Sequence, residues 1–474
     1  MPSSQIGLIG LAVMGANLAR NIAEKKFSIT VFNRTKEKTA EFIKNFGNQF
    51  LKGETELSRF VESLEKPRKI IIMVKAGNPV DEVISEVVPL LAAGDIIIDC
   101  GNSFYRDTNR RYTDLNLKKI HFIGCGVSGG EEGALYGPSL MPGGAIKVYH
   151  ELKPIFEAIA AKDFNGLPCV TYCGEDGAGH YIKMTHNGIE YSIMQMMAEA
   201  YDILRKLHNL SAPEIADIFE SYNRGLKLKS FLFEISLKVL RQRDELSHGY
   251  LIDHILDKAE QKGTGKWTAI DALERGVYLS SITEAVFARI ISFDHLRRHQ
   301  IASLYKNLRT SPKSPISIEE CIKSLEGALY LGLISSYAQG FDLIHKAAQA
   351  QSWNIDTAEI SRIWQGGCII RATLLQKLHS TFKNIVIGKH LLETGEIIKD
   401  IQTYLEDYRK IVSLAVLSGI PVPGLAAGLC YIESFSESHL PTNFIQGLRD
   451  YFGAHTYERI DREGVFHTNW NQNS

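Results

Sequence analysis

The first 175 or so residues alternate short apolar runs with longer, polar, helix-like stretches. Most of the runs are bounded by Gly or by polar clusters, and they are rich in Ile and Val. They lie at residues 6–10, 29–32, 69–74, 95–99, 121–124 and 169–173. Near-continuous apolar runs of this length are typical of strands buried on both faces, as in a parallel sheet covered by helices. The alternation therefore predicts βαβ units in a doubly wound α/β sheet.

After residue 179 the pattern changes to long helical periods without a convincing strand. Residues 178–207 are apolar on most sides of a helix, which predicts a buried central helix. Residues 182–204 also align with residues 322–344 at a constant offset of 140 positions, and their apolar positions repeat. We therefore expect a large all-α region with an internal duplication, two helical units packed about a pseudo-symmetry axis.

The chain closes with an aromatic tail that is too short to build a core of its own. So many aromatic side chains are unfavourable in water, so we expect the tail to dock on another surface, for which a second subunit is one candidate. These changes of pattern predict three units, at residues 1–177, 178–437 and 438–474.

Composition narrows the classes of protein. The 53 Lys and Arg nearly cancel the 54 Asp and Glu, giving a net charge of −1, which argues against a dedicated nucleic-acid binder. No run approaches the roughly 18 apolar residues that cross a bilayer, and the N-terminus lacks the basic region of a signal peptide. The seven cysteines have no zinc-site spacing. We expect a cytoplasmic protein with reduced thiols and no metal.

The first predicted βαβ unit carries a glycine-rich turn between its strand and its helix. The turn reads Gly10, Leu11, Ala12, Val13, Met14, Gly15, which is GxAxxG. Gly10 suits the tight turn, Ala12 lets backbone approach a pyrophosphate, and Gly15 lets helix and strand pack closely. A plain glycine turn is the alternative. Because a strand precedes the turn and a helix follows it, we favour a Rossmann-like dinucleotide site with phosphates on the helix N-terminus.

The end of the second predicted strand indicates which dinucleotide binds. An NAD site has Asp or Glu there for the ribose 2′-hydroxyl, whereas this chain has Asn33, Arg34 and Thr35. Arg34 can pair with a 2′-phosphate, and its two neighbours can donate hydrogen bonds. A solvated loop arginine is the alternative. The cofactor predicted by the sequence is NADP.

Four polar residues share one face of the predicted central helix, at i, i+3, i+4 and i+7. They are Lys183, His186, Asn187 and Glu190. A solvated stripe is the usual meaning of such spacing, but Ile182, Ile189, Ile193 and Met197 flank it and indicate burial. The aligned second copy keeps the apolar positions and loses three of the four polar identities. Burial lowers a lysine pKa and raises a glutamate pKa, so Lys183 suits a general base and Glu190 a general acid.

Two further stretches suit anions. Ser128, Gly129 and Gly130 present a hydroxyl and bare amides to a carboxylate, unless they form a simple turn. Residues 262–266 resemble a phosphate cradle in composition without matching a Walker loop, and Arg289 lies nearby in sequence on an apolar helix. In the tail, Arg449 and His455 are candidates for further anion contacts.

Several motifs recur in the same order in one known family. They are GLAVMG (10–15), FNRT (32–35), VKAG (74–77), GNS (101–103), GVSGGEEGA (126–134), KMTHNGIEY (183–191), QKGTGKWTA (261–269) and RDYFGAHTYE (449–458). On these residues the chain resembles decarboxylating 6-phosphogluconate dehydrogenase along essentially its full length.

The resemblance implies oxidation of 6-phosphogluconate at C3, with reduction of NADP to NADPH. Loss of the C1 carboxylate as CO2 and protonation of the resulting enediol then give ribulose 5-phosphate, a step of the pentose phosphate pathway. By this resemblance Lys183 takes the proton of the 3-hydroxyl and Glu190 protonates C1. It also implies a homodimer with a shared active site and no metal.

The same resemblance assigns the binding residues. Cofactor contacts are Asn33, Arg34, Thr35, Val74, Lys75, Ala76 and Asn102. Contacts to the carboxylate and hydroxyl end of the substrate are Asn102, Ser128, Gly129, Gly130, His186 and Asn187. The phosphate site is Tyr191, Lys262, Thr264 and Arg289, joined by Arg449 and His455 of the second subunit. Two alternatives remain: a β-hydroxyacid dehydrogenase without decarboxylation, and a non-catalytic NADP-binding sensor.

Overall fold

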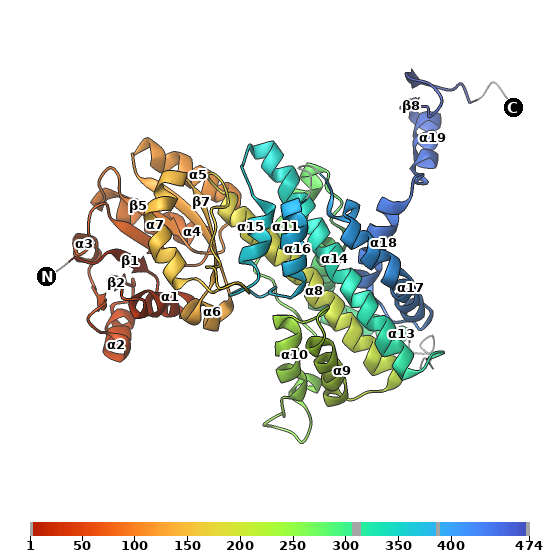
Figure 1. Ribbon diagram of the computed structural model, residues 1–474, viewed down its shortest axis with the longest axis horizontal. Coiled ribbons are helices and arrows are strands. Elements are labelled where there is room, and N and C mark those ends of the chain that lie inside the picture. Colours follow the sequence, from red (N-terminus) through yellow and green to blue (C-terminus); the bar gives the residue numbers. More distant parts are fainter. Residues whose placement is uncertain (1–2, 306–313, 385–388, 471–474) are drawn as a thin grey trace.

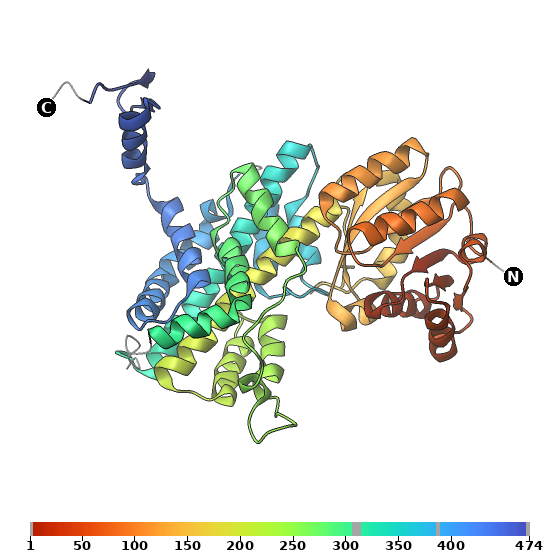
Figure 2. The same ribbon diagram turned by 180° about the vertical axis from the view of Figure 1, so that it is seen from behind.

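The computed structural model describes residues 3–305, 314–384 and 389–470. A sheet covered by helices occupies one end of the molecule and a helical bundle the other, with the tail standing off the bundle (Figures 1 and 2). This arrangement confirms the α/β plus all-α fold class expected from the hydrophobic pattern.

The sheet has seven strands in the order β3-β2-β1-β4-β5-β6-β7, and only the β6–β7 pair is antiparallel. Their bounds are Ile6–Ile9 (β1), Ile29–Phe32 (β2), Leu51–Gly53 (β3), Lys69–Ile72 (β4), Ile96–Asp99 (β5), His121–Ser128 (β6) and Ser139–Gly144 (β7). The Ile and Val runs of the central strands are buried because helices cover both faces. Chain order reverses between β1 and β4, the place where doubly wound folds bind ligands.

The helices of this region follow the strands in βαβ fashion. They are α1 (Val13–Glu24), α2 (Lys36–Phe46), α3 (Leu57–Glu62), α4 (Asn78–Val87), α5 (Tyr105–Leu117), α6 (Gly130–Tyr136) and α7 (Ile146–Ile159). Helices α1, α2 and α7 pack on one face of the sheet, and α3, α4 and α5 pack on the other. The carboxyl ends of the parallel strands therefore remain available to a ligand.

One predicted strand was wrong and two were missed. The run at residues 169–173 is buried but forms only an isolated bridge from Val170 to Leu140 of β7. Pro142 of β7 has no amide hydrogen with which to extend that ladder. Strand β3 is only three residues long, and Pro142 with two glycines hides β7 from a hydrophobic pattern.

The helical region is built around two long helices, α8 (Ala178–His208) and α14 (Ile318–Gln351), which pack together and are largely buried. The others are α9 (Ala212–Arg224), α10 (Phe231–Arg241), α11 (Thr264–Arg275), α12 (Ser280–Phe293), α13 (His295–Leu304), α15 (Thr357–Ile363), α16 (Leu374–Asn384), α17 (Gly395–Leu417) and α18 (Pro423–Ser436). The central helix expected from residue 178 onward is confirmed. The aligned segments fall on α8 and α14, as an internal duplication requires.

The tail consists of α19 (Thr442–Gly453) and a small hairpin of β8 (Tyr457–Glu458) and β9 (Val465–Phe466). The carboxylate of Asp450 holds these pieces together by accepting hydrogen bonds from the Thr456 and Thr468 amides and from the His467 and Trp470 side chains. Although burial opposes it, this set of donors lowers the pKa of Asp450 to about 2. The tail thus has a fixed shape while standing away from its own bundle (Figure 1).

Candidate active site

The glycine-rich turn closes tightly at the carboxyl end of β1. Gly10 has a φ of +107°, and a Cβ there would lie 2.4 Å from the Met73 carbonyl oxygen. A Cβ on Gly15 would lie 2.0 Å from the Gly10 carbonyl oxygen, so the first turn of α1 sits directly on the turn. No side chain caps α1. Its leading amides are therefore left for an anion, and this cradle fits a dinucleotide pyrophosphate.

A cavity of about 230 Å³ opens beside this turn. Its lining includes all three residues predicted to select NADP, together with Val74. Arg34 is exposed, and its Nη1 lies 3.6 Å from Oε2 of Glu82. Asn33 shapes the loop, because its Oδ1 accepts the Leu11 amide at 3.1 Å and its Nδ2 donates to the Thr35 carbonyl. Arg34 is thus the side chain in this lining that can offer charge to a 2′-phosphate, in competition with Glu82.

Two more loops approach from neighbouring strands. Residues 74–77 follow β4, where Lys75 is exposed and Ala76 half-buried. Residues 101–103 follow β5, where the carboxylate of Asp99 accepts the Gly101 amide at 3.0 Å and the Ser103 hydroxyl at 2.6 Å. Asn102 is exposed between these two anchored residues. The loop therefore presents the Asn102 side chain towards solvent at the carboxyl end of β5.

Helix α8 carries the four polar residues Lys183, His186, Asn187 and Glu190, here called the polar stripe, and its N-terminal end packs against β6. A Cβ on Gly126 would lie 2.4 Å from Cβ of Lys183, so only glycine lets the helix come this close. Lys183 is consequently 6% exposed. Burial lowers the pKa of Lys183, against an opposing influence of the Glu190 charge. The stripe therefore begins against β6, with Lys183 and His186 buried and Asn187 and Glu190 partly exposed.

Hydrogen bonds gather the expected carboxylate-binding side chains around Lys183. Lys183 Nζ donates to Asn187 Oδ1 and lies 3.5 Å from His186 Nδ1. His186 Nε2 lies 3.3 Å from the Ser128 hydroxyl, and Asn187 Nδ2 donates to the Thr264 hydroxyl at 3.1 Å. Gly129 and Gly130 follow Ser128 with positive φ values. The structure thus places Lys183 between the residues expected at the two ends of the substrate.

Glu190 lies about 10 Å further along the helix axis. The imidazole of His186 approaches it, with Nδ1 4.0 Å from Glu190 Oε2. Burial raises the pKa of Glu190, while the charges of Lys183 and Arg289 oppose that shift. Burial, with help from Lys183, lowers the pKa of His186 well below its usual value. The arrangement favours a neutral lysine and a protonated glutamate on one helix, a base and an acid for two substrate atoms.

The structure brings together some of the residues expected to bind the substrate phosphate. The guanidinium of Arg289 lies 3.3 Å from the ring centroid of Tyr191 and donates to the Glu260 carbonyl. Thr264 is buried at the start of α11, and Lys262 is exposed just before it. Tyr191, Thr264 and Arg289 therefore surround one end of the stripe. A cation stacked on a ring keeps free N–H donors for an anion.

Arg449 and His455 do not join this cluster within one chain. Arg449 is exposed on α19 and donates to Gln446 in the same helix, and His455 is exposed just after it. Helix α19 and the hairpin after it stand on the far side of the bundle from the sheet (Figures 1 and 2). Within this chain, the tail therefore does not bring these two residues to the cluster of Tyr191, Thr264 and Arg289.

Sequence reasoning missed two residues that shape the site. Asp99 anchors the loop of Asn102, and a carboxylate ending an Ile-rich strand was a usable signal for it. Glu82 enters the cofactor cavity from α4, and no sequence pattern marked it. Within the described ranges, no three His, Cys, Asp or Glu side chains form a group suited to a metal. No helix there is long and apolar enough to cross a membrane.

Comparisons with known proteins match both parts of the chain. Residues 5–174 match the family described as "NAD binding domain of 6-phosphogluconate dehydrogenase", and residues 179–470 match "6-phosphogluconate dehydrogenase, C-terminal domain". An NADP(+)-dependent, decarboxylating 6-phosphogluconate dehydrogenase of Bacillus subtilis is 47% identical over 99% of this chain and all of its own length. A decarboxylating relative from Shigella flexneri is 48% identical over 99% of this chain and likewise all of its own.

The structure of the Plasmodium falciparum 6-phosphogluconate dehydrogenase superposes with a TM-score of 0.94 at 41% identity. The match covers 98% of this chain and the whole of that one. That protein is described in its apo form, with its cofactor NADP+ and with its substrate 6-phosphogluconate. The similarity thus extends over both the sheet region and the helical region.

Proposed function

The chain belongs to the 6-phosphogluconate dehydrogenase family, and from that premise we propose which of its residues perform each part of the reaction. It is an NADP-dependent, decarboxylating oxidoreductase that converts 6-phospho-D-gluconate to D-ribulose 5-phosphate and CO2. The observation that carries the assignment of roles is that Lys183, which is buried, and Glu190, whose side chain is 20% exposed, lie on one face of α8 with pKa values shifted in opposite directions.

NADP, when bound, accepts the hydride that leaves C3 of the substrate. The cradle of residues 10–15 would hold its pyrophosphate, and Asn33, Arg34 and Thr35 its adenosine end. Val74, Lys75, Ala76 and Asn102 would line the side nearer the substrate. Support comes from the close packing at Gly10 and Gly15 and from the cavity that Arg34 lines.

Lys183 acts as the general base for the 3-hydroxyl. Burial lowers the pKa of Lys183, which favours the neutral amine that a base needs, and Asn187 holds this amine in place. Having taken the proton, the ammonium can donate a hydrogen bond to the new C3 carbonyl oxygen. That bond stabilises the negative charge which develops as the C1 carboxylate leaves as CO2. No metal is needed for this step, because the 3-keto acid already accepts the electron pair.

Glu190 acts as the general acid in the last step. Burial raises the pKa of Glu190, which favours the protonated carboxyl, and this carboxyl delivers its proton to C1 of the enediol. Ser128, Gly129, Gly130, His186 and Asn187 would hold the carboxylate and hydroxyl end. Tyr191, Lys262, Thr264 and Arg289 would hold the phosphate. Base and acid are then separated along a rigid helix, as two reacting carbons require.

A homodimer with shared active sites completes the phosphate end in this proposal. Arg449 and His455 would come from the tail of the second copy, because their own tail carries them away from their own site. Large apolar side chains of α19, including Phe444, Ile445 and Phe452, are exposed and suit docking on a partner. Deleting residues 438–474 should weaken the dimer and raise KM for the substrate. A dimeric truncated protein with unchanged KM would contradict the shared site.

Cytoplasmic location and the division into units at residues 1–177, 178–437 and 438–474 are parts of the same proposal. The seven cysteines support the location, because all of them are free thiols in the structure, the state that a reducing compartment maintains. The change from the sheet region to α8 near residue 178 supports the first boundary.

One assay tests the function as a whole. Reduced-cofactor absorbance is followed with 6-phosphogluconate and either NADP or NAD, while CO2 release is measured in parallel. We expect one CO2 for each NADP reduced and a preference for NADP. Reduction without CO2 would indicate a β-hydroxyacid dehydrogenase, and NADP binding without turnover would indicate a sensor.

A further inference from the structure

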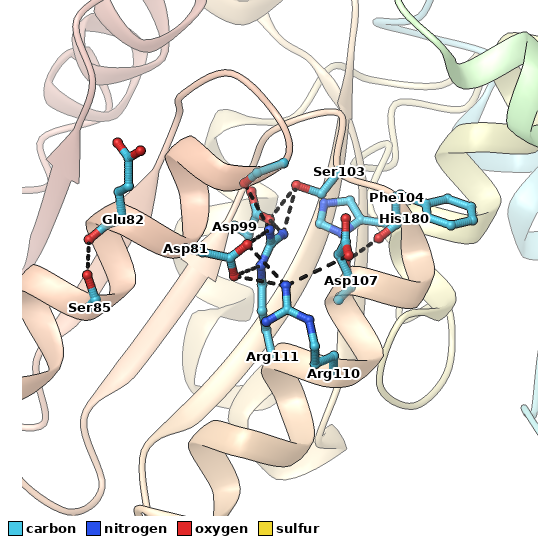
Figure 3. A network of polar contacts seen from close by, with 12 residues as sticks. Asp81, Glu82, Ser85, Asp99, Ser103, Phe104, Asp107, Arg110, Arg111 and His180 are labelled. Atoms are coloured by element: carbon cyan, nitrogen blue, oxygen red, sulfur yellow. Dashed lines mark hydrogen bonds and ion pairs between the residues drawn. The ribbon is translucent and has the colours of Figure 1, made fainter.

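Arg111 is a buried cation that the proposed reaction does not use. It lies on α5 and is 2% exposed. Its Nε and Nη2 donate to the two carboxylate oxygens of Asp81 at 2.9 Å, and Nη2 also donates to the Gly77 carbonyl at 3.0 Å. Its Nη1 lies 3.4 Å from Asp99 Oδ2 and 3.5 Å from the Ser103 hydroxyl (Figure 3). One guanidinium therefore contacts four residues.

These four partners belong to two loops that serve the same ligand. Gly77 closes the loop of residues 74–77 after β4, and Asp81 follows in the first turn of α4. Asp99 and Ser103 flank Asn102 in the loop after β5. Strands β4 and β5 are paired neighbours, with Ile72 opposite Asp99. Arg111 thus ties together the two loops expected to line the substrate side of the cofactor.

The contacts require the shape of an arginine. A guanidinium is a planar fork with five donors, and here donors on all three nitrogens are directed to different acceptors. Its hydrogen bond is the largest cause of the lowered pKa of Asp81, against a smaller effect of burial. Lysine would supply the charge as a single point and could not reach both loops at once. The fixed separation of the loops therefore depends on the guanidinium itself.

The same face of α5 also contacts the catalytic helix. The Thr108 hydroxyl, one turn before Arg111, lies 2.7 Å from Nδ1 of His180. His180 is buried in the first turn of α8, three residues before Lys183. Helix α5 therefore holds the loop of Asn102 through Arg111 and the start of α8 through Thr108.

We propose that Arg111 is a positioning residue for the hydride-transfer step. By holding residues 74–77 and 101–103 together, and through the rigid helix it shares with Thr108, it fixes Asn102 relative to Lys183. The proposal rests on the proposed function, since it assigns Arg111 a task in that reaction. Arg111 acts through these loops and is not itself a catalytic residue.

The test compares Arg111→Met and Arg111→Lys with the matched control Arg110→Met. Arg110 also donates to Asp81, but its side chain is 50% exposed and, unlike Arg111, it does not donate to Gly77, Asp99 or Ser103. We expect kcat to fall about 100-fold in Arg111→Met, the size of effect that a misplacement of about 1 Å produces. Arg111→Lys should rescue little of it, whereas Arg110→Met should stay within about twofold of the parent protein. KM for 6-phosphogluconate should rise less than kcat falls, because Asn102 is displaced while the expected substrate contacts of α8 are untouched.

Two readouts separate positioning from a loss of folded protein. The deuterium isotope effect on kcat with 3-deuterated 6-phosphogluconate should rise, because hydride transfer becomes rate-limiting, and the Kd for NADP should increase several-fold. A smaller folded fraction would lower kcat without moving either value. An unchanged isotope effect and Kd in Arg111→Met, whatever its kcat, would overturn the proposal.

If Arg111→Met fails to fold, Ser103→Ala provides a second test of the same proposal. This change removes one loop anchor and leaves the buried cation in place, so a smaller rise in the isotope effect is expected; no rise would overturn the proposal. Failure of the proposed function looks different. The parent protein would then release no CO2 from 6-phosphogluconate, while the NADP-binding comparison could still be made.

Discussion

Helices α8 and α14 are aligned copies of one unit, yet the residues at their four matched polar positions differ in identity and in contacts. Lys183, His186, Asn187 and Glu190 of α8 correspond to Lys323, Glu326, Gly327 and Tyr330 of α14. On α14, Glu326 accepts a hydrogen bond from Lys227 at 3.1 Å, Tyr330 donates one to Asp400, and Lys323 is exposed. On α8, Lys183 is buried and Glu190 is partly buried, and the pKa values of both are shifted towards the neutral form.

The comparison shows that the polar groups of the two copies serve different purposes. The α14 stripe is matched to partners within the fold, so it contributes to stability. On α8, burial disfavours the charged forms of Lys183 and Glu190. A negatively charged substrate beside Lys183 would offset this cost for the ammonium. The apolar positions, which both copies retain, keep the two helices packed together.

The largest effect expected is on turnover. Lys183→Ala should reduce kcat by about 1,000-fold, because a general base contributes factors of that order, while NADP binding and folding persist. Lys323→Ala, the matched change on α14, should leave kcat unchanged. Steady-state kinetics with NADP titration measures both. Comparable losses in the two variants would erase the distinction between the helices.

Glu190→Gln should lower turnover by about 100-fold, since the amide cannot deliver a proton to C1. Its matched control, Glu326→Gln, removes an ion pair and should leave turnover intact. The pH dependence of kcat provides a second test, because the two groups lose their active forms in opposite directions of pH. A neutral Lys183 is lost as pH falls through its lowered pKa, and a protonated Glu190 is lost as pH rises through its raised pKa. The profile of kcat should therefore be bell-shaped, and Glu190→Gln should abolish its alkaline limb.

Stability should move in the opposite direction to activity at Lys183. Because the folded state disfavours its ammonium, Lys183→Met should increase the free energy of unfolding at neutral pH. That gain is full below the lowered folded pKa and disappears as pH rises towards the unfolded value of about 10.4. Denaturant unfolding at several pH values measures the gap between variant and parent. Lys323→Met should show no such pH-dependent gap, and a constant gap at Lys183 would contradict the burial of its charge.

The smallest effect expected is at Tyr330. Tyr330→Phe removes the hydrogen bond to Asp400 and should cost about 1 kcal/mol of stability, with kcat unchanged. Chemical denaturation and steady-state kinetics on the same preparation check this. A fall in kcat without a loss of stability would mean that the α14 stripe also serves the reaction.

The sequence predicted most of what depends on local pattern. Ile-rich runs identified the central strands because burial on both faces demands apolar side chains throughout. The spacing of Lys183 and Glu190 predicted that they share one face of α8, because helical geometry fixes which side chains lie together. The run at residues 169–173 misled because burial alone does not create strand partners, and Pro142 limits the ladder beside it.

Contacts across the fold were harder to foresee. Nothing local shows that Glu82 reaches the cavity of Arg34, or that Arg111 joins two loops, because both depend on how α4 and α5 lie on the sheet. Asn33 was expected to face the cofactor, yet it also braces the Leu11 amide. The role expected for Arg449 and His455 rests on the proposed dimer, which no pattern within one chain can show.

The anchoring of the tail by Asp450 has a thermodynamic consequence. Because one carboxylate gathers four donors from across the segment, the tail enters any complex already ordered. Most of the conformational entropy of these residues is then lost when the chain folds, before any encounter with a partner surface. Association by this tail would resemble the joining of two rigid shapes more than the folding of a loose segment upon contact, with a correspondingly smaller entropic penalty.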